Sequence, residues 1–477
     1  MQWCALSKDS TQRGVAQAYR CIFSLPPRDE RDGFHPPPDE IMDPRPHDPS
    51  THTPLLDERR PTSPAARLVD SHTIVIVGAG AAGIAVAASL RARNPSLDVA
   101  LIDPASTHYY QPGWTMVGGG IFKAADTARD MSACIPPTVS WVRAAVSAFE
   151  PERNEILLDS GRRIRYERLV VCPGLKLNWQ GIEGLQETLG RNGVTSNYRF
   201  DLAPYTWKLV NALRGGNAVF TQPPMPIKCA GAPQKAMYLA CDAWRRAGIL
   251  QDMNVSFFNA GAVLFGVPDY VPALMSYVEA YGIALGFQHR LVAIDGSRKL
   301  ARFQRILPDG TTTTVEHGFD MIHVVPPQTA PDFIKCSPLA DSAGWVDVHA
   351  GTLRHTAFDN IWALGDAANT SNAKTAAAAR KQAPIVAHNV LASLGLEHGT
   401  ACYDGYGSCP LTVERGKIVL AEFLYGGKVS PTLPTWLING TRPSRAAWML
   451  KANVLPALYW EAMLKGREWL ARPAISR

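Results

Sequence analysis

A glycine-rich turn between two apolar runs constrains the fold of this chain more than any other feature of its sequence. Ile74–Val77 is a β-branched run with the composition of a buried parallel strand. The letters GAGAAG fill positions 78–83, and Ile84–Arg93 predicts a helix rich in Ala and Leu. A second apolar run, Val99–Ile102, ends at Asp103. This order of strand, turn, helix, strand and acidic residue predicts a dinucleotide-binding βαβ unit.

Each position of this turn has a physical task in such a unit. The first glycine allows the tight turn, the second lets the backbone approach a pyrophosphate, and the third lets helix and strand pack closely. The helix N-terminus offers free N–H groups to the phosphates, and the acidic residue can bind a ribose hydroxyl. The predicted dinucleotide contacts are Gly78, Gly80, Ala81, Ala82, Gly83 and Asp103. The alternative is an ordinary glycine-rich βα turn.

Length, charge and cysteine content limit the classes of protein that remain. A chain of 477 residues is too long for one core, so two or three domains are expected. The 48 basic and 42 acidic residues give a net charge of +6 without a basic run, so nucleic acid is not expected as a partner. The mild positive charge suits an anionic membrane surface or anionic substrates. Nine scattered cysteines argue against a disulfide scaffold and favour a redox role for a few of them.

The first 70 residues differ in composition from the rest of the chain. Proline is dense between Pro26 and Pro64 and hydrophobic periodicity is absent, which predicts a disordered or loosely attached extension. Met1–Pro27 carries three basic residues against one acid, a composition that fits a mitochondrial transit peptide. The alternative is a plain flexible tail.

A second βαβ-like unit begins at Gly216, but its turn lacks the glycines that a nicotinamide dinucleotide requires. Prolines fill much of the turn at 222–233, and proline supplies no N–H to a phosphate. The strand that would offer an acid to a ribose ends instead in Asn259. The second lobe is therefore predicted not to bind NAD(P)H, and a cysteine, Cys229, lies in its turn.

Two further segments are typical of a flavin site. The aromatic and glycine-rich loop at 108–120, which contains Gln111, can cover a flavin; the alternative is a surface loop with buried aromatics. A predicted strand at 360–364 leads into Gly365-Asp366 and then a helix at 374–394. The carboxylate of Asp366 can hydrogen-bond the ribityl chain of FAD, or it can cap the helix.

The C-terminal segment Arg445–Arg472 is rich in Trp, Met and Leu with basic residues between them. Pro456 is expected to split it into two short helices. Its apolar runs are too short to span a bilayer, so the segment is predicted to dock on a membrane surface. The alternatives are packing on the protein's own core or on a second copy in a homodimer.

Eight segments recur in the order typical of one flavoprotein family, namely HYYQPGWTMVGGG (108–120), PIKCAGAPQKAMYL (226–239), MIHVVPPQTAPD (321–332), SPLADSAGWVDV (337–348), GDAANTSNAKTAAAAR (365–380), YDGYGSCPL (403–411), VLAEFLY (419–425) and LKANVLPALYWEAMLKG (450–466). Together they resemble sulfide:quinone oxidoreductases of the type found in mitochondria and some bacteria. The resemblance implies FAD, two redox cysteines and a ubiquinone pocket at a membrane-facing surface. It also implies hydrogen sulfide as substrate and a small thiol or sulfite as sulfur acceptor.

The resemblance assigns roles to single residues. The redox pair is Cys229 and Cys409, which a sulfur bridge would join; no third cysteine lies near Ser196, so the two-cysteine type is implied. Lys228 and Lys235 flank Cys229 and could favour its thiolate. The predicted site consists of Cys229, Cys409 and Lys235 for catalysis, of Gln111, Gly365, Asp366 and Lys374 for FAD besides the first turn, and of Phe423, Tyr425, Tyr459 and Trp460 for quinone. No metal site is expected.

The expected architecture is α/β, with two Rossmann-like dinucleotide-binding domains as in FAD-dependent disulfide reductases and an amphipathic membrane-docking segment. The expected parts are an extension (1–70), the first FAD-binding part (71–205), a second Rossmann-like domain with a redox cysteine (206–330), the second FAD-binding part (331–400) and a quinone- and membrane-associating region (401–477). Peripheral binding to the mitochondrial inner membrane is implied, or to a bacterial-type membrane if no transit peptide is used. A type II NADH:quinone oxidoreductase is the alternative activity.

Overall fold

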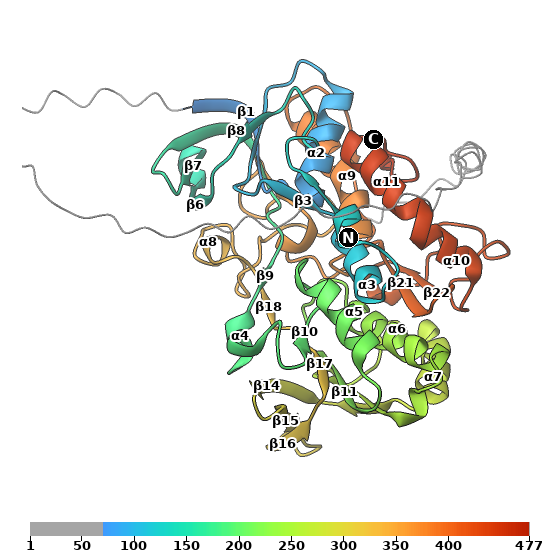
Figure 1. Cartoon of the computed structure of the whole chain (residues 1–477). Coiled ribbons are helices and arrows are strands. Elements are labelled where there is room, and N and C mark those ends of the chain that lie inside the picture. The colour runs from blue at the N-terminus through green and yellow to red at the C-terminus, as the bar shows by residue number, and fades with distance from the viewer. Residues whose placement is uncertain (1–69, 477) are drawn as a thin grey trace, which may run out of the picture. The chain divides into compact units, whose positions relative to one another are not determined.

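The computed structural model describes residues 70–476. The predicted transit peptide Met1–Pro27 and the rest of the extension up to Val69 lie outside the described residues. A mixed sheet and a parallel sheet form two lobes within the described part, as Figure 1 shows.

The first lobe is built on the predicted βαβ unit. Strand β1 (Asp70–Val77) lies between β2 (Val99–Ile102) and β8 (Arg163–Val171), and all three run parallel. The sheet has the order β5-β2-β1-β8-β7-β6, with β19 (Ile361–Ala363) parallel to the end of β8. Its outer strands are β5 (Ser140–Val142), β6 (Val146–Glu150) and β7 (Glu155–Leu158).

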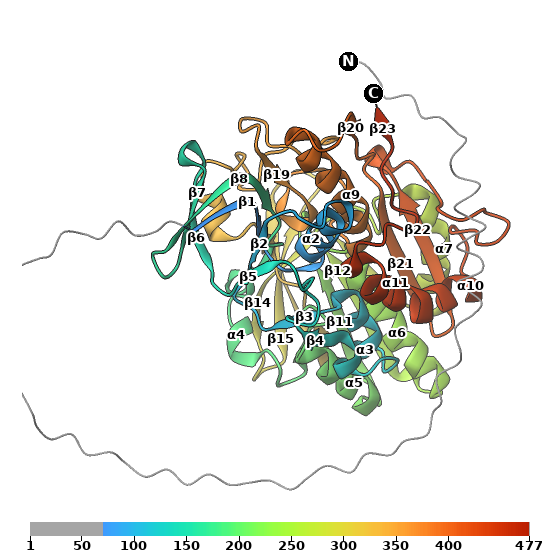
Figure 2. The ribbon, with the colours of Figure 1, turned by 90° about the horizontal axis from the view of Figure 1, so that it is seen from above.

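Two helices lie side by side on this lobe, α2 (Ala81–Arg93) and α9 (Ala376–Ser393), as Figure 2 shows from above. Helix α2 is buried over most of its length because Ala, Ile, Val and Leu fill both its sheet-facing and α9-facing sides. After β8 the chain leaves this sheet, and it returns at β19, where the residue number is higher by 190 (361 minus 171).

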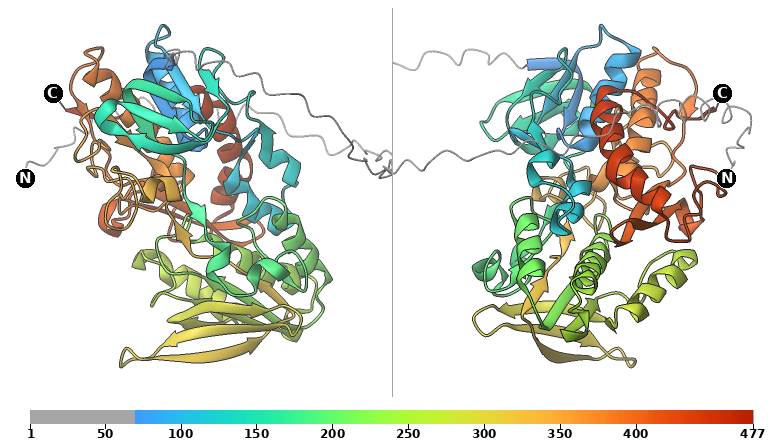
Figure 3. Two further views of the ribbon diagram at one scale, coloured as in Figure 1. Left: turned by 90° about the vertical axis from the view of Figure 1, so that its left-hand side faces the viewer. Right: turned by 45° about the vertical axis from the view of Figure 1, so that its right-hand side comes forward.

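The second lobe is a five-stranded parallel sheet in the order β10-β17-β11-β12-β13. Strand β10, which precedes the predicted boundary at residue 206, already belongs to this sheet. The strands are β10 (Val194–Thr195), β17 (Met321–His323), β11 (Gly216–Gln222), β12 (Met253–Asn259) and β13 (Ala284–Phe287), and the helices are α5 (Leu202–Ala212), α6 (Ala232–Arg246) and α7 (Val271–Ala280). Three antiparallel strands follow, namely β14 (His289–Asp295), β15 (Leu300–Ile306) and β16 (Thr312–Gly318), drawn in yellow in Figure 3.

Short elements connect and flank the two sheets. The segment 108–120, expected as a loop, contains the end of β3 and helix α3, because its aromatic side chains are buried and order the backbone. The short elements are β3 (Thr107–Tyr109), β4 (Ala128–Asp130), α3 (Trp114–Gly118), β9 (Lys176–Leu177), α4 (Leu185–Thr188), β18 (Gln328–Thr329), α8 (Asp332–Lys335), β20 (Thr400–Ala401) and β23 (Ile475–Ser476).

The C-terminal region is a hairpin followed by a helical segment. Strands β21 (Gly407–Glu414) and β22 (Lys417–Phe423) form the hairpin, and α10 (Arg445–Met449) and α11 (Leu455–Glu461) follow. Pro456 does not split the segment as expected, since a π-helical turn, Leu450–Val454, joins the two helices. The proline stands near the start of α11, where its missing N–H is tolerated. In residues 70–476 we find no helix long and apolar enough to cross a membrane.

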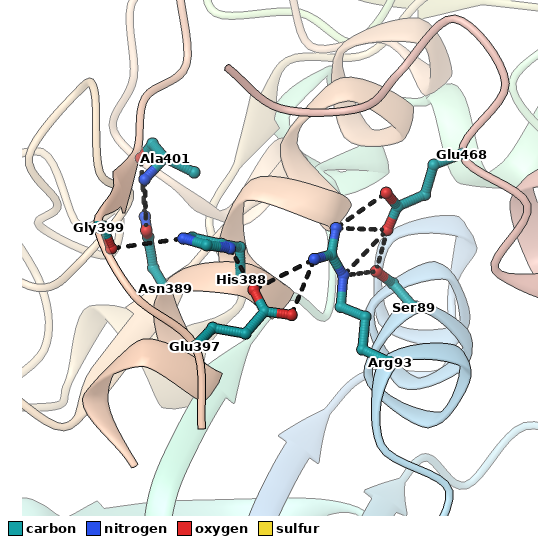
Figure 4. Close-up of polar contacts among 8 residues, drawn as sticks. All are labelled: Ser89, Arg93, His388, Asn389, Glu397, Gly399, Ala401 and Glu468. Atoms are coloured by element: carbon teal, nitrogen blue, oxygen red, sulfur yellow. Dashed lines mark hydrogen bonds and ion pairs between the residues drawn. The ribbon is translucent and has the colours of Figure 1, made fainter. Parts of the chain in front are cut away.

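One side of this C-terminal segment packs on the first lobe. Tyr459 and Trp460 belong to the same buried cluster as the strands of the first sheet. Gly466 has φ +67°, and a Cβ there would lie 2.4 Å from the carbonyl oxygen of Ala88 in α2. Figure 4 shows the next contact, in which Arg93 of α2 binds Glu468 and also Glu397. The tail is therefore partly core, as one of the sequence-based alternatives stated.

Candidate active site

The structure brings the two predicted redox cysteines together although 180 residues separate them. Cys229 lies in the turn between β11 and α6, and Cys409 lies in β21. Their Sγ atoms are 3.8 Å apart. This is longer than a disulfide bond of about 2.05 Å, so the two sulfurs are not covalently joined and lie at hydrogen-bond distance.

The turn that carries Cys229 is held by several contacts. Cys229 has φ +50°, in the left-handed region that residues other than glycine rarely adopt. Its N–H donates to the carbonyl oxygen of Lys374 at 2.8 Å, and the Tyr198 hydroxyl donates to the carbonyl oxygens of Lys228 and Cys229. A Cβ on Gly231 would lie 2.5 Å from Sγ of Cys409, so only glycine lets the hairpin approach this closely.

A buried lysine sets the charge of the pair. Nζ of Lys235, a side chain only 2% exposed, donates to Sγ of Cys229 at 3.1 Å. A hydrogen bond with Cys409, together with the Lys235 ammonium, holds the pKa of the Cys229 thiol well below its usual value despite burial. Hydrogen bonding to Cys229 and burial raise the pKa of Cys409. Cys229 is therefore the thiolate of the pair and Cys409 the thiol.

Lys451 is a second cation near the pair that the sequence-based prediction missed. It lies in the π-helical turn, is 3% exposed, and donates from Nζ to the carbonyl oxygen of Pro112 at 3.1 Å. Burial, and next the charge of Lys235, lower the pKa of Lys451 to about 7. One signal was available in the sequence, since Lys451 shares a helical face with Leu455 and Tyr459 in an otherwise apolar stretch.

The glycine-rich turn of the first lobe has the geometry that its sequence predicts. Gly78 has φ +103°, and a Cβ on Gly83 would lie 1.8 Å from the Gly78 carbonyl oxygen. A Cβ on Gly80 would meet nothing within 4 Å, so this position faces open space before the N-terminus of α2. The Asp103 carboxylate accepts from the N–H groups of Ala79 and Ala105. Its contact with a ribose stays a prediction.

We call the glycine-rich turn at 78–83 the phosphate cradle. The Gly-Asp turn after β19, Gly365-Asp366, lies next to this cradle and is also linked to the cysteines. Gly365 has φ +70°, and a Cβ there would lie 3.3 Å from Cβ of Ala82, at the start of α2. Lys374 donates from Nζ to the carbonyl oxygens of Asp366 and Ala368, while its own carbonyl oxygen binds the N–H of Cys229. The turn therefore connects the phosphate cradle to the cysteine pair.

Near this turn, burial disfavours the charged forms of Asp366 and Lys374, and opposite charges nearby favour them. Burial raises the pKa of Asp366, against the opposing charges of Lys374 and Lys228. Burial lowers the pKa of Lys374 to about 8, and Asp366 opposes this shift. Lys228 donates from Nζ to Oε1 of Gln111 at 2.6 Å, so its ammonium binds this amide, whereas the ammonium of Lys235 binds the sulfur of Cys229.

Unsatisfied polar groups near the 108–120 segment fit a bound polar cofactor. Nε1 of Trp114, Oγ1 of Thr115 and both amide atoms of Asn197 are buried without a hydrogen-bond partner among residues 70–476. An unpaired buried donor or acceptor costs about 1–3 kcal/mol. Together with the open cradle at Gly80, these groups fit the dinucleotide and isoalloxazine parts of FAD.

The structure separates the predicted quinone residues into two groups. Phe423 is half-buried at the end of β22 and packs edge-on against Phe265, with ring centroids 6.2 Å apart. The nearby Tyr425 donates its hydroxyl to the Ala350 carbonyl oxygen at 3.0 Å. Tyr459 and Trp460 are buried in the first lobe. Contact of any of these rings with quinone stays a prediction.

The two lobes and the cysteine pair between them define a class, the flavin-dependent oxidoreductases of the disulphide-reductase type. Residues 72–218 match the family model for pyridine nucleotide-disulphide oxidoreductases. The chain is 44% identical over 405 residues to the mitochondrial sulfide:quinone oxidoreductase of Dictyostelium discoideum, covering 84% of this chain and 87% of that relative. The mitochondrial sulfide:quinone oxidoreductase of Mus musculus is 35% identical over 395 residues, with 83% and 87% covered. This chain belongs to the sulfide:quinone oxidoreductase family, and its cofactor is FAD.

A solved structure shares the fold. The sulfide:quinone oxidoreductase of the hyperthermophilic bacterium Aquifex aeolicus matches with a TM-score of 0.66 at 19% identity, over 84% of this chain and 92% of that chain. At this identity the match concerns the fold alone. It agrees with the α/β architecture of two dinucleotide-binding domains that the sequence predicts.

Proposed function

We propose that this chain oxidises hydrogen sulfide and passes the electrons through FAD to ubiquinone. The observation that carries the proposal is the cysteine pair, with its sulfurs 3.8 Å apart and Lys235 3.1 Å from Cys229. The pair lies beside the Gly-Asp turn of the FAD site through the bond from the Cys229 N–H to Lys374. Membership of the sulfide:quinone oxidoreductase family supports the same activity.

The oxidised enzyme carries a sulfur bridge between Cys229 and Cys409, and HS⁻ attacks the Cys409 side. In the simplest form of the bridge, one bond between the cysteine sulfurs breaks and one bond from Cys409 to the sulfide sulfur forms. Cys409 then holds a persulfide, and Cys229 leaves as a thiolate. The lowered pKa of Cys229 makes it the better leaving group, and the Lys235 ammonium holds the charge that develops there.

A small thiol or sulfite then takes the sulfane sulfur from Cys409 and leaves a second cysteine thiolate. When bound, FAD would supply the two-electron acceptor that lets the two cysteine sulfurs bond again and the route by which the electrons reach ubiquinone. In sum, H₂S and RSH give RSSH, two protons and two electrons, which reduce the quinone to its quinol. With sulfite the product is thiosulfate and the balance is the same.

We further propose that quinone enters from a membrane at the C-terminal region. Phe423 and Tyr425 supply aromatic faces on which a planar quinone can stack. Trp436 is 79% exposed and Met449 62% exposed, and both are close in sequence to members of the apolar cluster that joins the loop before α10 to that helix. An exposed Trp and Met beside basic residues suit the interface of a bilayer. We also propose peripheral binding to the mitochondrial inner membrane; the mitochondrial relatives support a mitochondrial location.

Anaerobic titration with sulfide, followed by optical spectra, tests the activity. We expect a long-wavelength charge-transfer band and bleaching of the flavin band, both reversed by quinone. Cys229→Ser and Cys409→Ser are expected to abolish the response while FAD stays bound. Cys336→Ser, which changes an exposed cysteine of the described part outside the pair, is the matched control. Near-normal turnover in both pair variants would refute the assignment.

A further inference from the structure

One buried histidine joins the C-terminal helix to the glycine-rich turn. Nδ1 of His108 lies 3.2 Å from the carbonyl oxygen of Ala79, and Nε2 lies 2.7 Å from the hydroxyl oxygen of Tyr459. His108 is 3% exposed and Tyr459 4% exposed. Neither contact was predicted from the sequence; His108 is 29 positions from Ala79 and 351 positions from Tyr459.

The chemistry of the partners determines where the protons lie. A carbonyl oxygen only accepts, so Nδ1 of His108 must carry the hydrogen that Ala79 receives. Burial lowers the pKa of His108 to about 4, so the ring is neutral at pH 7 and Nε2 has no hydrogen. The Tyr459 hydroxyl therefore donates to Nε2. The chain of hydrogen bonds runs from Tyr459 through His108 to Ala79.

These hydrogen bonds, together with one from Asp103, hold both the N–H and the carbonyl group of Ala79 in the phosphate cradle. The Ala79 N–H donates to Oδ2 of Asp103 at 2.7 Å, while the Ala79 carbonyl accepts from His108. In a planar trans peptide, the N–H of Gly80 points opposite to the carbonyl of Ala79. Holding that carbonyl therefore fixes the direction of the Gly80 N–H. A Cβ on Gly80 would meet nothing within 4 Å, so there is open space beside this residue.

The tyrosine is itself held in position. Its ring is 4.8 Å from the ring of Tyr110, and the guanidinium of Arg129 lies 4.2 Å over the neighbouring Trp460. Beyond α11, Glu468 binds Arg93 at the C-terminal end of α2, with Nη2 to Oε2 at 2.8 Å (Figure 4). The C-terminal segment thus contacts the C-terminal end of α2 directly. Through Tyr459 and His108 it also contacts the glycine-rich turn before the N-terminus of α2.

We propose that His108 and Tyr459 are positioning residues for FAD, and that helix α11 forms part of the dinucleotide site. Through Ala79 they hold the Gly80 N–H in the orientation that binds the pyrophosphate. Their contribution is to retention of the cofactor and does not depend on the sulfide or quinone steps.

The rate of FAD release from the full-length holoenzyme after dilution, read from the fluorescence of free flavin, tests this proposal. Tyr459→Phe keeps the ring and removes one hydroxyl, and we expect release about ten-fold faster, the effect of one lost hydrogen bond. Tyr281→Phe is the matched control. It removes a buried hydroxyl that donates to the Val413 carbonyl oxygen at 3.1 Å in the second lobe, and we expect no change in FAD release.

A double-mutant cycle separates positioning from general packing. His108→Asn retains an N–H donor near Nδ1 but cannot accept from Tyr459, so release should be less affected than in His108→Phe. In the His108→Asn background, Tyr459→Phe should have no further effect, because the tyrosine acts through the histidine. The proposal is overturned if Tyr459→Phe releases FAD at the original rate, if Tyr281→Phe accelerates release equally, or if the two substitutions add.

Discussion

Lys235 determines the chemistry of the cysteine pair more directly than any other side chain near it. Its ammonium is 3.1 Å from Sγ of Cys229 and is buried. Burial lowers the pKa of Lys235, but the two sulfurs raise it by more, so the lysine stays charged. An ion pair of thiolate and ammonium is the resting form that these contacts favour.

Lys235→Met is therefore expected to raise the pKa of Cys229, by about one unit or more, and to slow its alkylation at neutral pH about ten-fold. The measurement is the rate of alkylation of reduced enzyme against pH. Lys228→Met is the matched control, because that ammonium binds Gln111 instead of the sulfur. An unchanged pH profile in Lys235→Met would contradict the role given to this lysine.

The sequence predicted the residues proposed to react better than the residues that hold them in position. Cys229, Cys409 and Lys235 lie in segments that resemble a known family, so their roles could be stated before their positions. The apolar helical face around Lys451 could indicate that this lysine is buried, but the partners of Lys451 and Tyr198 could not be assigned, because a lysine or a tyrosine in a helix or loop has no local signature of the group it faces. Their contacts depend on how distant segments meet in the folded chain.

At the scale of elements, the turn between β11 and α6 holds a cysteine at the position where related folds bind a dinucleotide phosphate. Its backbone N–H groups are used by the protein itself, since Lys228 donates to the side chain of Gln328 at 2.7 Å and Cys229 donates to Lys374 at 2.8 Å. A dinucleotide phosphate would need such groups to be free. The turn serves to position a sulfur.

We therefore expect NADH and NADPH to leave the flavin oxidised under conditions in which sulfide bleaches it. Rapid anaerobic mixing, followed at the flavin band, is the measurement. Sulfide mixed with the same enzyme sample is the positive control. Prompt bleaching by NADH would instead support a type II NADH:quinone oxidoreductase.

The helical segment after residue 444 combines two surfaces. Tyr459, Trp460 and Leu464 are part of the first-lobe core, so removal of the whole segment would damage the fold. The side proposed to meet the membrane is better tested at its exposed residues. Figure 3 shows α10 and α11 in red at the edge of the fold.

The double variant Trp436→Ser, Met449→Ser is expected to lose most co-sedimentation with anionic liposomes and to keep sulfide-dependent reduction of the flavin. Loss of interfacial Trp and Met removes apolar area that the bilayer would bury. Val263→Ser, a substitution of another exposed apolar residue in the second lobe, is the control. Liposome binding equal to the original protein would count against this surface.

Elements with a strong local pattern were predicted closely. The sequence predicts a strand at Asn217–Thr221 and a helix at Pro233–Ala247, and β11 and α6 lie within one residue of these bounds, because apolar runs and helix-forming residues mark them. The π-helical turn before Pro456 was not predicted, since local rules favour a break at proline. Burial of Lys451, Tyr459 and Trp460 on one side holds the segment helical across that point.

At the scale of the whole molecule, each lobe contains a buried neutral histidine. Burial lowers the pKa of His108 in the first lobe and of His323 in the second lobe to about 4 each, from 6.5. His323 accepts from the N–H of Asn197 through Nε2 at 2.9 Å, which a protonated ring could not do. Protonation of these two groups is thus opposed by the fold in both lobes.

The sign of the resulting pH dependence follows from linkage. Between pH 6.5 and 4 the unfolded chain binds a proton at each histidine and the folded chain does not, so stability falls as the pH falls through this window. Each histidine contributes about 1.4 kcal/mol per pH unit there.

We expect His108→Asn to flatten the dependence of the unfolding free energy on pH by about that slope, measured by urea unfolding between pH 7 and 4.5. His398→Asn, at an exposed histidine, should leave the slope unchanged. Equal slopes for His108→Asn and the original protein would mean that His108 is protonated in the folded chain, and the direction of the Tyr459–His108–Ala79 hydrogen bonds would then have to be reversed or abandoned.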